Sequence, residues 1–300
     1  MGIYNEITAN RWKTGLLVVL FFGLVIFMGL MVGVFYGSTS FGLILAVIIG
    51  GLYFLFSYYA GAGMILAMSH AKEAKKPEHA YLINLVEGLS IAAGLSKVPK
   101  VYVMEDSALN AFATGRNPEN SAVAITTGLL SKLNRQELEG VIAHELSHIK
   151  NYDIRVMMLA AVMVGVTVLL SDFLLRSFLW GGKSRDSGHN TTTLALVAFG
   201  VILAVLSPII GEMIKLAISR KREFLADASG ALLTRHPKGL ADALRKIKND
   251  PDPLVDTANK ATAGLFISMP FRHNGKKTFI SALFNTHPPL EERIKRLEQM

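Results

Sequence analysis

The sequence contains no cysteine among its 300 residues. This absence excludes disulfide bonds, thiolate metal sites and cysteine nucleophiles, so any metal has to be bound by His, Asp or Glu. Charged residues are also scarce, at 18% of the chain against 51% hydrophobic residues, and the mean hydropathy is positive. Such a composition is too apolar for an ordinary soluble enzyme and predicts a membrane protein.

A polybasic tract is absent as well, although the net charge is +8. The cations lie mainly beside long apolar runs, where they would meet anionic lipid headgroups. We therefore expect membrane lipid as a partner and no nucleic acid.

Two uncharged runs, 15–36 and 41–68, are each long enough to cross a hydrocarbon core as a helix. The first is too long for the apolar region of a signal peptide, and the second follows it after a short polar link. Arg11 and Lys13 precede the pair and Lys72 follows it, whereas the link carries no cation. By the positive-inside rule, both outer flanks of this hairpin should face the cytoplasm.

A second apolar pair, 156–175 and 193–211, is a weaker signal. Asp172 lies inside its first run, and Pro208 interrupts its second. We interpret the pair as a second spanning hairpin, with helices buried shallowly or against protein as the alternative. This predicts about four transmembrane helices. The chain is then divided into a hairpin over 1–69, the first part of a domain outside the membrane over 70–155, the second hairpin over 156–211 and the second part of that domain over 212–300.

The segment between the hairpins combines helices with short strands. Amphipathic spacing predicts a helix over 78–93. Asn134 and Glu137 have the spacing of a capping box, and the helix that they begin continues to Ile149. We therefore expect a mainly α fold with a small sheet. Its strands are predicted at 98–104, 110–114 and 122–126.

An H-E-x-x-H pattern is formed by His144, Glu145 and His148. Two histidines four residues apart project from one face of a helix, where both can bind one zinc ion, and the glutamate then lies beside the metal. The alternative is a set of ordinary polar helix residues.

Catalytic zinc usually takes three protein ligands and leaves a fourth position open, so a third ligand is required. Glu223 is the best candidate, and Asp227 lies four residues later on the same helical face. Glu223 could bind the metal while Asp227 accepts a hydrogen bond from a ligand histidine. The alternative for Glu223 is a salt bridge to a basic neighbour such as Arg222. His144 and Glu223 can meet only if the chain between them crosses the membrane an even number of times.

The chain resembles the HtpX family of membrane metalloproteases, which are relatives of the CAAX prenyl proteases within the thermolysin-like gluzincins. The resemblance rests on the early hairpin and on spaced motifs in the expected order. It implies a thermolysin-like zinc protease domain that cleaves damaged or misassembled membrane proteins on the cytoplasmic side, in quality control and stress response. The motifs are Asn110-Ala111-Phe112-Ala113, His144-Glu145-x-x-His148, Arg222-Glu223-x-x-x-Asp227 and Thr286-His287-Pro288-Pro289-Leu290-x-x-Arg293.

The same resemblance implies roles for individual residues. Glu145 would be the general base, and Asp227 would orient a ligand histidine. Asn110 to Ala113 would form an exposed edge strand that binds the substrate backbone by main-chain hydrogen bonds. His287 and Arg293 would stabilise the oxyanion. Simpler alternatives stay open: Asn110 as a turn former, His287 as a helix cap and Arg293 as a solvated charge.

These observations predict a zinc endopeptidase with one zinc ion per chain, located in the plasma membrane with its active site and both termini in the cytoplasm. Its substrates would be unfolded or misassembled membrane proteins. A non-proteolytic zinc-binding scaffold is the first alternative, although a structural zinc would usually have four protein ligands. A transporter is the second, but Asp172 would be its only intramembrane acid. The sequence makes no prediction of the oligomeric state or cleavage preference.

Overall fold

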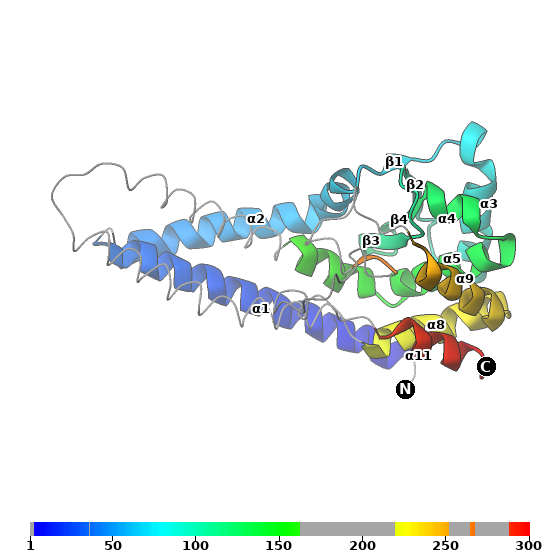
Figure 1. Ribbon diagram of the computed structural model, residues 1–300. Coiled ribbons are helices and arrows are strands. Elements are labelled where there is room, and N and C mark those ends of the chain that lie inside the picture. The colour runs from blue at the N-terminus through cyan, green and yellow to red at the C-terminus, as the bar shows by residue number, and fades with distance from the viewer. Residues whose placement is uncertain (1–2, 36, 163–219, 252–264, 268–287) are drawn as a thin grey trace.

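A computed structural model describes residues 3–35, 37–162, 220–251, 265–267 and 288–300 (Figure 1). The described part is mainly helical with a small mixed sheet, as predicted. Most of the predicted second hairpin over 156–211 lies outside the described residues, and so does His287.

The chain begins with a helical hairpin that extends away from the rest of the molecule (Figure 1). It consists of α1 (Ile3–Phe35) and α2 (Thr39–Met68). Ser38 caps α2, its hydroxyl accepting a hydrogen bond from the backbone N–H of Phe41 at 3.3 Å. Both helices are long and apolar enough to cross a membrane. α1 starts well before the uncharged run that predicted it.

The hairpin buries small residues and exposes large apolar ones. A Cβ atom at Gly42 would collide with the backbone of Gly29 and Gly33, so the two helices are in close contact there. Small residues at such a crossing are typical of helix pairs within membranes. Gly42, Ala46 and Gly50 form part of the buried face of α2. On α2 the exposed large side chains include Ile44, Ile48, Leu52 and Phe56, which recur every fourth residue.

The sheet contains β1 (Lys72–Glu73), β2 (Lys100–Met104), β3 (Ala111–Asn117) and β4 (Asn120–Thr126). The strand order is β1-β2-β4-β3. β2 and β4 are parallel, whereas β3 and β4 form an antiparallel hairpin that leaves β3 at one edge. The predicted strands are thus found at nearly their predicted positions, and β1 is an addition that pairs with β2.

Helix α5 (Arg135–Lys150) forms the centre of the domain and packs against β3, β4 and several helices. The predicted capping box begins it. Asn134 Oδ1 accepts from the N–H of Glu137 at 3.0 Å, and Glu137 Oε2 accepts from the N–H of Asn134 at 2.8 Å. Almost all of the helix after its first turn is buried. Around it lie α3 (Lys76–Ala92), α4 (Thr127–Lys132), α8 (Arg220–Thr234), α9 (Pro237–Asn249) and α11 (Leu290–Leu297).

Candidate metal centre

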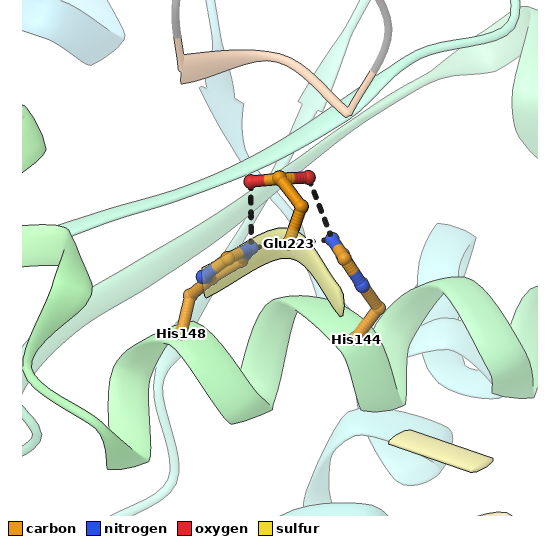
Figure 2. A group of neighbouring side chains, drawn as sticks. All are labelled: His144, His148 and Glu223. Carbon is orange, nitrogen blue, oxygen red and sulfur yellow. Dashed lines mark hydrogen bonds and ion pairs between the residues drawn. The ribbon is translucent and has the colours of Figure 1, made fainter. Parts of the chain in front are cut away.

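Three buried side chains converge where α8 crosses α5 (Figure 2). The Nε2 atoms of His144 and His148 are 3.2 Å apart. Glu223 faces both rings, with Oε2 at 3.7 Å from Nε2 of His144 and Oε1 at 3.6 Å from Nε2 of His148. The structure thus brings together the three residues that the sequence predicted as metal ligands.

Each histidine has a carboxylate behind it. Nδ1 of His144 lies 3.0 Å from Oδ1 of Asp227, and Nδ1 of His148 lies 3.0 Å from Oδ2 of Asp153. An ionised carboxylate can only accept, so Nδ1 carries the hydrogen in each ring and the lone pair of Nε2 points into the cluster. This is the tautomer that a metal ligand needs.

Asp153 was not predicted from the sequence. It follows α5 by three residues, and Tyr152 before it has a left-handed backbone with φ of 60°. This turn directs Asp153 back towards His148. In the sequence, Asp153 is simply an Asp five residues after His148. This spacing does not predict that the chain turns back at Tyr152.

The donor set fits a single zinc ion. Two imidazole nitrogens and one carboxylate oxygen are typical ligands of catalytic zinc, at bonds of about 2.0–2.2 Å. Donor separations of 3.2 to 3.7 Å suit three ligands sharing one ion. The two rings differ in their electrostatic surroundings. Burial lowers the pKa of His148, but the hydrogen bond to Asp153 and the charge of Glu223 outweigh it and raise the pKa to about 9. Burial and the charge of Arg293 lower the pKa of His144.

Glu145 lies next to this cluster on α5 and is buried. Its Oε1 atom has no hydrogen-bond partner among the described residues, and its carboxylate accepts from the backbone N–H of Ala113. Burial raises the pKa of the Glu145 carboxyl to about 7, against the lowering effects of His148 and Arg293. A general base works best with a pKa near the working pH, so the position and environment of Glu145 suit that task.

Arg293 comes from α11 and is completely buried at the same cluster. Its guanidinium donates to both oxygens of Asp227, at 2.8 and 2.7 Å, and Nη1 lies 3.3 Å from Oε2 of Glu223. The same Nη1 donates to the carbonyl of Ile267 at 3.2 Å. The interpretation of Arg293 as a solvated charge is therefore wrong. Its contacts are with the residues that surround the metal ligands.

The predicted substrate strand, Asn110 to Ala113, is at the sheet edge, but the expectation that this edge is exposed is wrong. These residues are all buried. The carbonyl of Ala111 accepts from the N–H of Ile267 at 3.0 Å, and the rings of Phe112 and Phe266 are in edge-to-face contact at 5.1 Å. The short segment 265–267 therefore occupies part of the edge. Asn110 lies directly before β3, and its Oδ1 accepts from the N–H of Ala111 at 3.1 Å.

Comparisons with known proteins agree on one family. Residues 76–300 match the sequence profile of Peptidase family M48. The chain is 46% identical to a protease HtpX homolog of Dictyoglomus turgidum over 99% of this chain and 94% of that protein. It is 41% identical to a protease HtpX homolog of Lactobacillus helveticus over 99% of this chain and all of that protein.

Among solved structures, the chain resembles Ste24p of S. mikatae. The TM-score is 0.50 at 18% sequence identity, over 98% of this chain and 67% of that one. A likeness at this level of identity concerns the fold alone.

Proposed function

The chain belongs to peptidase family M48, as its motifs predicted, and we propose that it is a zinc endopeptidase of the membrane with His144, His148 and Glu223 as metal ligands. Membership makes it a metallopeptidase. The observation that carries the rest is the convergence of these three buried donors, each histidine backed by a carboxylate, beside the buried carboxyl of Glu145.

When bound, zinc supplies a Lewis acid for a carbonyl oxygen and lowers the pKa of a water molecule to about 7. Glu145 takes the proton of the attacking water on its carboxylate and later delivers that proton to the nitrogen of the leaving amine. One carboxyl group thus serves as base and then as acid, and it is unchanged at the end of the cycle. Glu145 has an oxygen available for this transfer, because Oε1 makes no hydrogen bond within the described residues.

Asp227 and Arg293 support the ligands in this proposal. Asp227 fixes the tautomer of His144, and Arg293 binds Asp227 through both oxygens. We propose that Arg293 and His287 also stabilise the oxyanion. In support of Arg293, its Nη2 atom lies 3.3 Å from Nε2 of His144, so its positive charge is beside a candidate ligand atom.

A peptide substrate would add to the edge of β3 as an extended strand, using Asn110 to Ala113. The peptide groups of this edge face the site, since the N–H of Ala113 donates to Glu145. Main-chain hydrogen bonds make little demand on substrate sequence. The carbonyl of Ala111, which a substrate would use as an acceptor, already accepts from the N–H of Ile267. The segment 265–267 would therefore have to move away from the edge when a peptide binds.

The proposed architecture is a thermolysin-like domain divided as the sequence predicted, over 70–155 and 212–300, with hairpins over 1–69 and 156–211. About four spanning helices would place the site and both termini on the cytoplasmic side. The two apolar helices of the first hairpin support membrane insertion. Arg11 on its outer flank supports the orientation.

Unfolded or misassembled membrane proteins are the substrates that this arrangement suits. A site attached to a membrane hairpin meets cytoplasmic segments of other membrane proteins, and strand addition requires those segments to be extended. Quality control and stress response are the corresponding cellular roles.

The test uses the full chain, purified in detergent under metal chelation and then supplied with zinc. We expect the native chain to bind one zinc ion and to cleave an unfolded protein. Glu145→Gln should bind zinc normally but cleave about 10²–10⁴-fold more slowly, because it lacks the base. The matched control is Glu139→Gln on the same helix, which alters only a surface pair with Arg135 and should keep full activity. Zinc binding by the native chain without cleavage would favour the scaffold.

A further inference from the structure

A chain of hydrogen bonds connects the first helix to the metal centre. Nδ2 of Asn10, in α1, donates to Oδ1 of Asp153 at 2.6 Å and to the carbonyl of Asn151 at 2.8 Å. Asp153 in turn accepts from Nδ1 of His148 at 3.0 Å. Asn10 and Asp153 are both buried, although they lie 143 positions apart in the sequence.

The orientation of the Asn10 amide follows from its neighbours. A backbone carbonyl and a carboxylate can only accept, so the NH₂ group has to face Asn151 and Asp153. The amide oxygen, Oδ1, is buried and has no hydrogen-bond partner among the described residues. Burial of an amide costs free energy that an apolar side chain would not, so the two donated hydrogen bonds are the contribution that is specific to Asn10.

Arg222 and His148 both lie near the Asp153 carboxylate, and the hydrogen bond from Asn10 holds that carboxylate towards His148. Nη1 of Arg222, on α8, lies 3.6 Å from Oδ1 of Asp153. Asn10 binds this same oxygen, while Oδ2 accepts from His148. Without Asn10, the carboxylate could rotate towards Arg222, because charged pairs attract strongly in a buried site. His148 would then lose the acceptor that sets its tautomer and ring orientation.

We propose that Asn10 is a positioning residue for the metal centre, which holds Asp153 in the rotamer that orients His148. The proposal rests on the proposed metal site and adds that zinc affinity depends on the docking of α1 against the end of α5. A second contact joins the same elements, since the guanidinium of Arg11 lies 5.9 Å from the centre of the Tyr152 ring. Separation of the first membrane helix from the domain would therefore weaken metal binding.

The primary test compares Asn10→Leu with Thr14→Val in the full chain in detergent. Both changes replace a polar side chain of α1 by an apolar one of similar volume. Among the described residues, the hydroxyl of Thr14 donates to the backbone carbonyl of Asn10, one turn earlier. Zinc affinity is measured by competition with a chromophoric chelator. Loss of a hydrogen-bond partner of a ligand histidine typically weakens metal binding about 10–100-fold. We expect Asn10→Leu to weaken zinc binding by about tenfold or more. Thr14→Val should stay within about twofold of the native chain.

A double-mutant cycle separates positioning from a merely structural role. In a background of Asp153→Ala, Asn10→Leu should change zinc affinity by no more than about twofold, because the carboxylate through which Asn10 is proposed to orient His148 is gone. Asp153→Asn provides a second, isosteric background. The visible spectrum of bound Co²⁺ reports ligand geometry and should shift in Asn10→Leu but not in Thr14→Val.

Equal zinc affinity in Asn10→Leu and Thr14→Val would overturn the proposal, and so would an undiminished effect of Asn10→Leu in both Asp153 backgrounds. Because these measurements concern binding, they do not depend on hydrolysis. A native chain that binds no zinc would overturn the proposed metal site together with this inference. A native chain that binds zinc, with variants that bind it equally well, would overturn this inference alone.

Discussion

Carboxyl and guanidinium groups lie buried together around the metal centre. Asp227 contacts His144 and Arg293, and Glu223 contacts both histidines and Arg293. A charge removed from water is tolerated only when it is paired and hydrogen-bonded. At the scale of single residues, the site is thus a network in which removal of one member leaves another uncompensated.

Arg293→Met tests this network. Asp227 and Glu223 would lose their buried cation, so the free energy of unfolding should fall by about 3–5 kcal/mol. The comparison is Arg296→Met on the same helix, whose guanidinium pairs with Glu292 at 2.8 Å and lies over the Phe224 ring. The side chain of Arg296 is 51% exposed against 0% for Arg293, and its loss should cost about 1 kcal/mol. Thermal unfolding in detergent measures the stability of both variants. An equal loss of stability in Arg293→Met and Arg296→Met would contradict the buried network.

At the scale of elements, the metal centre depends on how closely α8 approaches α5. A Cβ atom at Gly230 would lie 3.0 Å from the backbone nitrogen of His144 and 3.2 Å from the carbonyl carbon of Ala143. Gly230 is seven residues, or about two turns, after Glu223 and so lies on the same face of α8. The absence of a side chain here lets the helix that carries the third ligand lie directly on the helix that carries the other two.

Gly230→Ala should push α8 away from α5. We expect zinc affinity to fall by about tenfold or more, because the ligand helices are no longer in register, and stability to fall with it. Gly88→Ala is the matched control, since Gly88 is exposed in α3 with nothing within 4 Å of an added Cβ. That change should leave zinc affinity unaltered and stabilise the chain by about 0.5–1 kcal/mol. Chelator competition and thermal unfolding on the same samples distinguish the two outcomes.

At the scale of the whole molecule, the hairpin and the domain follow opposite packing rules. The domain buries its large apolar side chains around α5, as a soluble protein does. The hairpin buries small residues and exposes large ones along α2. Exposed apolar surface of this extent favours lipid as the medium around the hairpin and water as the medium around the domain.

Leu52→Arg and Ile91→Arg test that division. Both side chains are apolar and exposed, at 65% and 70%, but Leu52 is near the middle of α2 and Ile91 is in α3. An arginine at the centre of a spanning helix costs about 2.5–3.5 kcal/mol on insertion scales, whereas one on a wet surface costs little. Leu52→Arg should therefore reduce the amount of chain in alkali-washed membranes, and Ile91→Arg should not. Equal recovery of both variants would argue against a spanning α2.

Much of the site could be predicted because its spacing is local. His144 and His148, or Glu223 and Asp227, share a face of any α-helix, whatever the rest of the chain does. The capping box at Asn134 and the apolar hairpin are equally local, since they depend on short-range hydrogen bonds and on run length. Family motifs then predicted that Arg293 belongs with them, and the structure puts it at the same cluster.

The sequence by itself determined the two apolar helices, the helical motif of the candidate metal centre and the family. Only the tertiary structure decided that Asp153 turns back to His148, that Asn10 reaches Asp153 and that residues 265–267 cover part of the edge of β3. These features are single hydrogen bonds formed across a reversed turn or between distant segments. Hydrophobic periodicity and motif spacing carry no information about them, because such contacts depend on where whole elements pack.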